Sequence, residues 1–355
     1  HAHIDPRKQG RAMCELFGAY GWGFGVRDMK YLADHFMVRG INRLVPHAFS
    51  PKAFPDPDCP PHFYAHGENP EYRHFATLMA YAQRVCHLID GGRHSAPVAM
   101  LYEAEAYWAG KNEWGQSACR ALLEAQLDFD LLPCDLLDDE QSAVLDDGLR
   151  VNGETYQALV IPYAQFLPTA VARFTARAAE RGFPVYFLRA LPEGTSDSLL
   201  PAEFYGQVVQ PEQLVETLRA AGIGDLRVNP AFPGLRVYHY IHEEHIYLLS
   251  NETLGTVFDG ELHIPLRGTP YCYDPLENCL RPLSWRQEGE TLVVQLRLEP
   301  YELLVIGVGE APCLPVRPAP QPAGCRTELT GWTVSLARAK EYPAFGEAWR
   351  MEQLH

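Results

Sequence analysis

The chain has 355 residues, of which 47% are hydrophobic and 21% are charged, and its formal net charge is −15 at pH 7. This is an ordinary globular composition, and the length is enough for two or three domains. The negative charge disfavours nucleic acid and anionic membrane surfaces as partners. No apolar run approaches the ~20 residues that cross a bilayer, and no signal peptide is recognised. We therefore expect neither nucleic acid nor a membrane as a partner.

The nine cysteines contain no C-x-x-C pair. Neither a disulfide framework nor a zinc knuckle is therefore indicated. Free thiols are typical of a reducing compartment, so we expect a cytoplasmic protein. A secreted or periplasmic location is the alternative, because a mature chain would have lost its signal. The chain opens with His1-Ala-His3 and no Met, and we expect both ends to be cut from a longer protein.

The first informative stretch is a short apolar run, Ala12 to Cys14, that leads into Glu15. The run predicts a strand buried on both faces, as in a parallel sheet. A carboxylate there cannot be buried alone without a large desolvation cost, so Glu15 is either paired or faces a cleft at the strand's open end. In parallel α/β barrels, catalytic groups gather at the carboxyl ends of the strands. The alternative is a structural glutamate held by an arginine or by backbone N–H groups.

A glycine-rich loop with three aromatic residues follows, namely Tyr20, Trp22 and Phe24. Flat apolar rings of this kind line ligand sites. Residues 26–39 then predict an amphipathic helix, and residues 41–45 predict a second short strand. Strand, helix and strand within ~35 residues form a βαβ unit. His47 and Phe49 would therefore leave the sheet at the same end as Glu15.

A long loop at residues 50–69, rich in proline and aromatic residues, is expected to form an ordered rim. Its Asp56, Asp58 and His62 could be taken as metal ligands, but short Asp/His clusters are common in loops, and we predict no metal site. Asn69-Pro-Glu71 predicts the start of a helix that runs to Ile89.

From residue 94 to residue 224, strand and helix patterns alternate, which predicts a small doubly wound domain with a parallel sheet. A short helix is expected near residues 138–145. The domain lacks G-x-G-x-x-G, a P-loop and a nucleophile elbow, so no nucleotide site or hydrolase triad is indicated.

From residue 225 to residue 310 the pattern has period two. Residues 235–241 and 245–250 predict a hairpin, and further short strands predict an antiparallel sandwich. The stretch Asn251-Glu252 is interpreted as a turn without chemistry of its own. Residues 311–355 predict a stiff proline-rich linker and the first strand of another β module, Gly331 to Leu336.

Several of these segments resemble large bacterial glycoside hydrolases that carry a (β/α)₈ barrel. The matching segments are Met13-Cys-Glu-Leu-Phe-Gly-Ala-Tyr-Gly-Trp22, Met29-Lys-Tyr-Leu-Ala-Asp34, Arg39-Gly-Ile-Asn42 and Val45-Pro-His-Ala-Phe49. The order of domains resembles the family 42 β-galactosidases, in which the α/β domain is amidotransferase-like and helps the protein to oligomerise. The local motifs are more similar to relatives of the family 106 α-L-rhamnosidases. The resemblance implies an α/β plus all-β chain: the end of a (β/α)₈ barrel (residues 1–93), an amidotransferase-like α/β domain (94–224), a β-sandwich (225–310) and a further β module (311–355).

The resemblance also implies roles for particular residues. Glu15 would end the seventh barrel strand and Val45 to Phe49 the eighth. In a galactosidase-like scheme Glu15 is the nucleophile of a retaining enzyme, and an acid/base Glu lies on strand four. In a rhamnosidase-like scheme Glu15 is the base, and a calcium ion holds the sugar; otherwise no cofactor is expected. Strand four is absent, so the general acid and the rest of the barrel must come from outside this chain.

Candidate sugar contacts follow from the same scheme. Tyr20, Trp22 and His47 would bind the substrate, because aromatic rings stack on sugar faces and His bonds hydroxyls. His62 and Tyr64 are weaker candidates. The alternatives are a barrel-rim packing role for Trp22 and a structural role for His47.

The sequence therefore predicts a fragment of a bacterial glycoside hydrolase that cleaves a terminal sugar from oligo- or polysaccharides. Its expected partners are the carbohydrate, the remaining barrel segment of the same protein, and further copies of itself. The rival hypothesis is a non-catalytic carbohydrate-binding or scaffold fragment.

Overall fold

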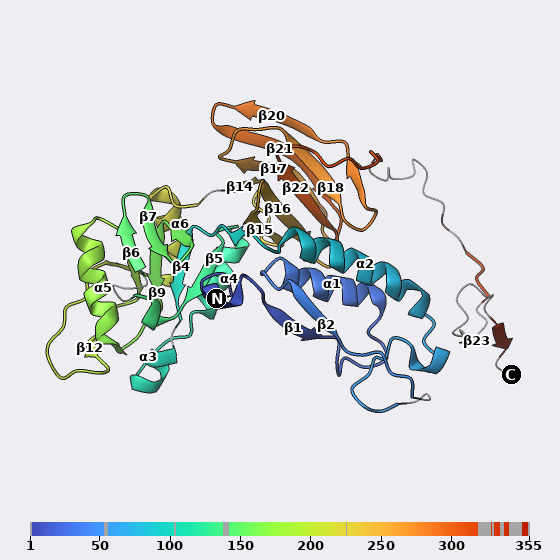
Figure 1. Cartoon of the computed structure of the whole chain (residues 1–355), viewed down its shortest axis with the longest axis horizontal. Coiled ribbons are helices and arrows are strands. Elements are labelled where there is room, and N and C mark those ends of the chain that lie inside the picture. Colours follow the sequence, from blue (N-terminus) through green and yellow to red (C-terminus); the bar gives the residue numbers. More distant parts are fainter. Residues whose placement is uncertain are drawn as a thin grey trace.

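The computed structural model describes residues 2–52, 56–102, 104–137, 142–224, 226–318, 328, 330–333, 337–340 and 350–353. Figure 1 shows a parallel α/β part at the left, a small unit with two strands and two helices at the lower right, and a β-sandwich above. Among the described residues, every helix is too short or too polar to span a bilayer.

The small unit contains two parallel strands, β1 (Met13–Leu16) and β2 (Arg43–Pro46). Helix α1 (Val26–Met37) connects them, and helix α2 (Tyr72–Leu88) follows β2. The predicted βαβ unit is therefore confirmed. Helix α1 ends two residues earlier than expected, where Gly40 adopts a φ of +86°. Closure of this unit into a barrel stays a prediction, because the described residues supply only these two strands of it.

The prediction that the first strand is buried on both faces is wrong. Met13 is 65% exposed and Val45 is 47% exposed, whereas Leu16 is 2% exposed. One face of the pair packs on α1 and α2. No part of the described chain covers the face that carries Met13, which explains its exposure.

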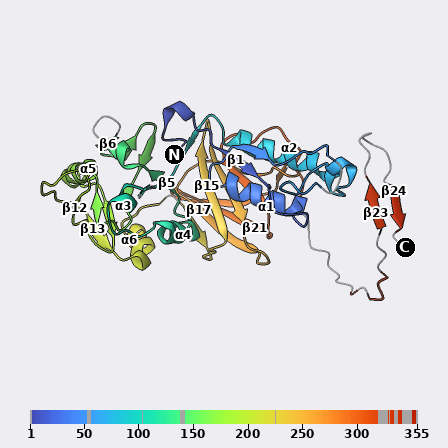
Figure 2. The same ribbon diagram turned by 90° about the horizontal axis from the view of Figure 1, so that it is seen from below.

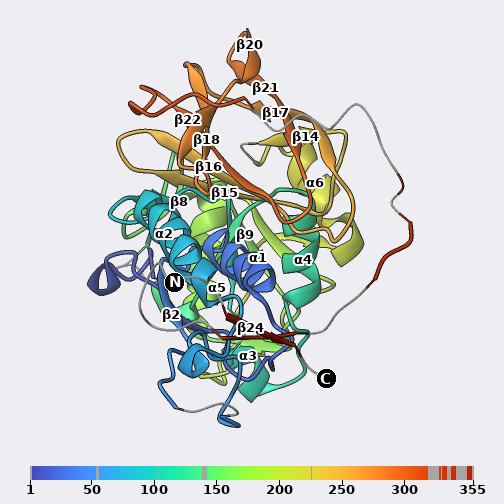
Figure 3. The same cartoon turned by 90° about the vertical axis from the view of Figure 1, so that its right-hand side faces the viewer.

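Helices α1 and α2 lie between two sheets, as Figure 3 shows. Their apolar sides share one core with β1 and with the six-stranded sheet of the sandwich. Core members from α1 and α2 are Met29, Ala33, Met37, Leu78, Tyr81 and Val85, and those from the sandwich are Tyr238, Tyr240, Leu248, Tyr273, Leu303 and Val305. The unit is therefore held on its helical side, and its other face is left open.

The α/β part has a five-stranded parallel sheet in the order β13-β11-β9-β4-β5. Helices α4 and α6 pack on one face and α5 on the other, as expected of a doubly wound sheet. The strands are β4 (Val98–Leu101), β5 (Phe129–Leu132), β9 (Ala158–Ile161), β11 (Val185–Leu188) and β13 (Gln207–Val209). The helices are α3 (Ala104–Ala109), α4 (Gln116–Glu124), α5 (Thr169–Glu180) and α6 (Leu214–Ala220).

The predicted helix near residues 138–145 is wrong where it can be compared. Residues 138–141 lie outside the described residues, and Ser142–Leu145 forms strand β6. This strand pairs with β7 (Gly148–Val151), which pairs with β8 (Glu154–Tyr156). A two-residue loop, Asp146-Asp147, joins β6 to β7, and Gly148 begins β7 with a φ of +134°, which a helix does not allow.

The sandwich has a four-stranded sheet, β14-β17-β21-β20, and a six-stranded sheet, β19-β18-β22-β16-β15-β3. Their facing side chains form one core, and the predicted hairpin of β15 (Leu235–Ile241) and β16 (His245–Asn251) is confirmed. The other strands are β3 (Arg93–His94), β14 (Arg227–Asn229), β17 (Phe258–Ile264), β18 (Pro270–Asp274), β19 (Cys279–Arg281), β20 (Ser284–Glu288), β21 (Thr291–Leu298) and β22 (Leu303–Val308).

The remaining elements are short. Strands β10 (Phe166–Leu167) and β12 (Gly194–Thr195) pair in parallel, and 3₁₀ turns cover Pro6–Lys8, Ala65–Gly67, Cys134–Leu137 and Pro211–Gln213. Seen from below, the N-terminal residues lie between the α/β part and the β1–β2 unit (Figure 2). Ile4 is fully buried there, and its carbonyl accepts from Asn152 at 2.6 Å.

The predicted linker begins as a packed segment. Val316 bridges Leu280 of β19, whose N–H donates to the Pro315 carbonyl at 2.8 Å. Residues 319–327 and 334–336 lie outside the described residues, and they include the second part of the linker predicted at 311–324 and half of the strand predicted at 331–336. Farther on, β23 (Ala337–Lys340) pairs with β24 (Arg350–Gln353).

Candidate active site

Glu15 lies near the carboxyl end of β1, opposite Val45 of β2 in the register of the pair. Its side chain is exposed. Among the described residues it makes neither a side-chain hydrogen bond nor an ion pair. The neighbouring arginines pair elsewhere: Arg43 binds Asp90 at 2.7 Å, and Arg11 lies 4.0 Å from the same carboxylate. Glu15 is thus available to solvent rather than held by an arginine.

The loops that follow β1 and β2 form one rim with the loop at residues 56–64. Because the two strands are parallel, their carboxyl ends meet at the same edge of the sheet. Backbone hydrogen bonds then tie the three loops together. They run from His47 N to Leu16 O (2.7 Å), Ala19 N to Cys59 O (3.3 Å), Gly21 N to Pro60 O (2.8 Å) and Phe63 N to Ala48 O (3.1 Å).

The rim brings Trp22, His62 and His47 into a row. The Trp22 and His62 ring centroids are 5.5 Å apart in an edge-to-face arrangement, and His62 and His47 are 6.3 Å apart. Trp22 is 39% exposed, whereas His62 is 2% exposed and its Nε2 pairs with the Asp58 carbonyl at 2.6 Å. The buried His62 ring therefore packs against the partly exposed Trp22 ring. Direct contact between His62 and a sugar stays a prediction.

His47 carries a buried Nδ1 atom, for which the described part of the chain supplies no hydrogen-bond partner. Such an atom costs free energy unless a ligand or water satisfies it. Its ring rests against the backbone of Gly18, where an added Cβ would lie 3.2 Å from His47 Cγ. A glycine at position 18 therefore lets the imidazole approach the end of β1 closely.

The other two predicted contacts lie in separate groups. Tyr20 is 55% exposed and stacks on Phe24 with the ring centroids 4.6 Å apart. Tyr64 stacks on Phe49, with centroids 5.3 Å apart and planes within 5° of parallel. Phe49 is 57% exposed at the expected end of the sheet, but its stacking on Tyr64 was not predicted.

A pocket of about 360 Å³ lies beside Trp22. Asn69 and Glu71 form part of its wall. Both are already engaged: Asn69 donates to the His62 carbonyl at 3.0 Å, and Glu71 accepts from the Val26 N–H at 2.7 Å at the start of α1. The pocket walls are therefore fixed by the elements that meet there.

Asp56, which was considered as a metal ligand together with Asp58 and His62, is engaged in local hydrogen bonds. The Asp56 carboxylate accepts from the Ser50 hydroxyl at 3.1 Å and from the Asp58 N–H at 3.2 Å, which is a local turn. Within the described ranges, no group of three or more His, Cys, Asp or Glu side chains is arranged to hold a metal ion.

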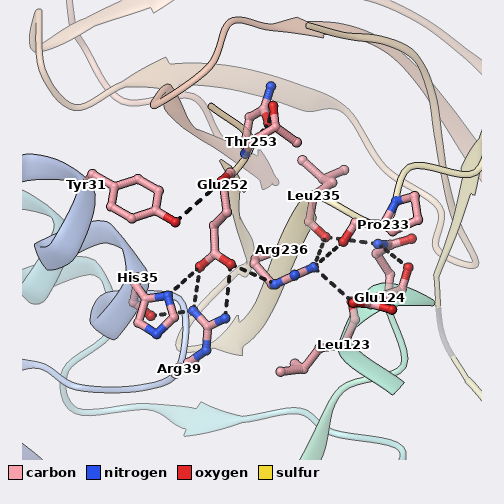
Figure 4. Close-up of polar contacts among 12 residues, drawn as sticks. Tyr31, His35, Arg39, Leu123, Glu124, Pro233, Leu235, Arg236, Glu252 and Thr253 are labelled. Carbon is pink, nitrogen blue, oxygen red and sulfur yellow. Dashed lines mark hydrogen bonds and ion pairs between the residues drawn. The ribbon is translucent and has the colours of Figure 1, made fainter. Parts of the chain in front are cut away.

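A charged cluster around Glu252 was not foreseen, because Asn251-Glu252 was interpreted as a turn. Figure 4 shows His35 of α1, Arg39 from the turn that follows α1, and Arg236 of β15 converging on this carboxylate. Arg39 donates to it at 2.6 and 3.1 Å, His35 Nδ1 lies at 3.0 Å and Arg236 Nε at 2.9 Å. Burial by itself would raise the pKa of Glu252, but hydrogen bonds from His35 and Arg39 lower this pKa to about 2.

The Glu252 cluster also reaches the α/β part. The Arg236 guanidinium donates to the carbonyls of Pro233 at 2.6 Å and of Leu123, in α4, at 3.4 Å. Arg39 and Glu252 are 213 positions apart, so no local sequence signal could have joined them.

A second buried cluster joins β3 to β5. His94 is 3% exposed and lies 3.0 Å from Asp130 and 2.7 Å from Asp128. Its ring stacks on Tyr238 with centroids 4.4 Å apart. Although burial acts in the opposite direction, the two carboxylates raise the pKa of His94 well above its usual value. The enclosed pairs give this cluster a structural role.

The fold defines the class to which the chain is similar. No family model matches the chain, and no curated protein matches it. Solved glycoside hydrolase structures do match it, so the predicted resemblance is confirmed at the level of the fold.

Three of these structures have TM-scores above 0.5. A rhamnosidase from Novosphingobium sp. has a TM-score of 0.65 at 18% identity, over 92% of this chain and 33% of its own. α-L-Fucosidase isoenzyme 2 from Paenibacillus thiaminolyticus has a TM-score of 0.56 at 12% identity, and the match covers 84% of this chain and 60% of the fucosidase. A GH42 exo-carrageenase from Bacteroides ovatus has a TM-score of 0.51 at 11% identity, and the match covers 84% of this chain and 41% of the carrageenase. The chain thus spans a third of the length of the rhamnosidase.

Proposed function

We propose that this chain is part of a glycoside hydrolase that cleaves a terminal sugar from oligo- or polysaccharides. The observation that carries the proposal is the exposed, unpaired carboxylate of Glu15 at the carboxyl end of a parallel strand. The fold shared with glycoside hydrolases supports it. In parallel α/β barrels this end of the strands holds the active site.

Glu15 acts in one of two ways. As a nucleophile it attacks the anomeric carbon, the leaving oxygen departs with a proton from a second carboxylic acid, and water later hydrolyses the glycosyl-enzyme. The two carboxyl groups then lie ~5–5.5 Å apart. As a base it removes a proton from water that attacks the anomeric carbon directly, which requires ~6.5–9.5 Å between them. In both cases the general acid belongs to a strand outside this chain.

The rest of the barrel is the first partner in this proposal. Strands β1 and β2 would be its last two strands, and residues 1–93 cannot close a barrel that typically takes ~250 residues. The exposed Met13 and Val45 would then face the barrel interior. The same scheme includes three further proposals. They are domain boundaries at residues 93, 224 and 310, an amidotransferase-like character of the α/β part, and self-association of the protein.

The rim supplies the proposed sugar contacts. Trp22 and Tyr20 expose ring faces, and His47 offers a buried nitrogen that lacks a partner. Tyr64 contributes through its stack with Phe49. In the rhamnosidase-like form a calcium ion would hold the sugar, and the described residues contain no cluster of three or more His, Cys, Asp or Glu side chains that would bind it unaided.

The proposal is tested by Glu15→Gln in the full-length protein. We expect the turnover of aryl glycosides to fall by several orders of magnitude while circular dichroism and Tm stay unchanged. Glu290→Gln, which alters an exposed carboxylate of the sandwich paired with Arg267, is the matched control and should keep full turnover. Normal turnover in Glu15→Gln would refute the assignment and favour the non-catalytic alternative. The anomer first released, followed by NMR, separates nucleophile from base.

A further inference from the structure

A groove of about 670 Å³ runs along α4, away from Glu15 and the rim. One wall is a stripe of α4 that includes Gln116, Arg120 and Glu124, which fall at i, i+4 and i+8 of the helix. The other wall is the edge strand β5, through Phe129 and Leu131. The volume is within the range of small-molecule sites in proteins.

Two aromatic rings flank the entrance of this groove. Tyr102 directly follows β4 and is 45% exposed, and Trp114 precedes α4 and is 54% exposed. Trp114 packs on Tyr107 with ring centroids 5.2 Å apart, which holds its orientation. Ligands of open parallel sheets bind outside the carboxyl ends of the strands, which is where Tyr102 lies.

The Glu252 cluster of Figure 4 also lines the groove, through His35, Arg39, Arg236 and Glu252. Glu252 is paired with both Arg39 and Arg236, so this cluster carries one net positive charge. On α4, Arg120 and Glu124 balance each other in charge. The groove therefore offers fixed donors and acceptors next to flat apolar rings, without a large net charge that would select an ion.

We propose that this α4 groove binds a neutral oligosaccharide, as a second carbohydrate site apart from the Glu15 rim. Each sugar hydroxyl both donates and accepts, which suits a wall of alternating guanidinium and carboxylate groups. The apolar face of a pyranose ring suits the exposed faces of Trp114 and Tyr102. Helix α4 has nine residues and is therefore ~13 Å long, enough to follow a short sugar chain rather than one sugar.

The test uses the full-length protein carrying Glu15→Gln, so that bound polysaccharide is not consumed. The probe is a microarray of neutral plant polysaccharides, and bound members are then titrated by tryptophan fluorescence. We expect Trp114→Ala to weaken binding by about tenfold, as loss of one stacking ring predicts. Trp285→Ala, which removes another partly exposed tryptophan on β20, should leave the affinity unchanged.

A second measurement keeps this proposal distinct from the proposed function. With Glu15 intact, Trp114→Ala should leave turnover of a small aryl glycoside unchanged and should lower turnover of the bound polysaccharide. Binding to no array member, or equal affinity in Trp114→Ala and its parent, overturns the proposal. A change in oligomeric state on size-exclusion chromatography without a change in sugar affinity would assign the groove to a second copy and would also overturn it.

Discussion

Gly18 and His47 determine how closely two loops approach each other at the end of β1. The imidazole lies against the Gly18 backbone, and its Nδ1 atom is buried without a partner. A side chain that is fixed in place by packing and keeps one polar atom unsatisfied is prepared to bind a ligand. The predicted sugar contact of His47 therefore depends on the residue at position 18.

Gly18→Ala tests this dependence. The added Cβ would lie 3.2 Å from His47 Cγ and 3.4 Å from Nδ1, so the ring must move by a few tenths of an ångström. We expect kcat/KM of the full-length enzyme to fall about tenfold, because a small misplacement at a site is costly. Gly23→Ala is the control, since nothing lies within 4 Å of its added Cβ. Equal kinetics in the two variants would contradict a positioning role.

Trp22 is the exposed member of its row of rings, and His62 supports it from below. We expect Trp22→Ala to raise KM about tenfold through the loss of a stacking surface, with a smaller change in kcat. Trp22→Phe should recover part of the affinity. Steady-state kinetics on an aryl glycoside measure both values. An unchanged KM in Trp22→Ala would leave Trp22 with a packing role only.

At the scale of elements, Glu252 connects α1 to the hairpin of the sandwich, and Arg236 connects that hairpin to α4. Glu252 is about 10% exposed, so the two guanidiniums would lose a largely desolvated partner if it were removed. Removing one member of a buried ion pair typically costs about 3 kcal/mol. We expect Glu252→Gln to lower the free energy of unfolding by about this amount in urea titrations, whereas exposed Glu299→Gln should change it little.

The same carboxylate gives a pH dependence. Its pKa is about 2 in the folded protein against a usual value of 4.5. A lowered folded-state pKa means that the stabilisation is complete above pH 4.5 and is lost as the pH falls towards 2. We expect the loss of stability between pH 4.5 and pH 2 to be shallower in Glu252→Gln than in the parent. Parallel curves for the two proteins would show that other carboxylates dominate acid unfolding.

At the scale of the molecule, the layers explain why the β1–β2 pair is stable without a closed barrel. The pair rests on α1 and α2, which rest on the six-stranded sheet, and one continuous core joins all of them. The outer face has no such support, and Met13 and Val45 are exposed on it. This is the face on which we propose that the remaining barrel segment packs.

The proposal that another barrel segment covers this face predicts how the 355-residue chain behaves by itself. We expect the chain alone to be folded, to bind the dye ANS at the exposed apolar face, and to lack turnover of aryl glycosides. Met13→Lys with Val45→Lys should reduce the dye signal, since both side chains lie on the open face. Turnover by the isolated chain would contradict a general acid outside it.

Much of the fold could be predicted from local patterns. The apolar stripe of α1 and the alternation along β15 and β16 are strong periodic signals, and both elements lie where they were expected. Strand β20 was missed because all five of its residues are exposed, so it has no apolar face to detect. The residues of the candidate site were predicted, but their contacts with one another were not. Phe49 stacks on Tyr64, and the His62 side chain is buried.

The sequence by itself determined the order of the elements, the βαβ unit and Glu15 as the carboxylate to examine, because periodicity and strand ends are local properties of the chain. Only the tertiary structure decided that Glu15 is exposed and makes no ion pair with a described residue, and that one face of β1 and β2 is open. It also decided that Glu252 joins His35 and Arg39 to Arg236, which in turn contacts α4. Those outcomes depend on which surfaces meet across hundreds of residues. Burial and charge pairing follow from the packing of segments that are distant in sequence, and no local stretch of sequence encodes that packing.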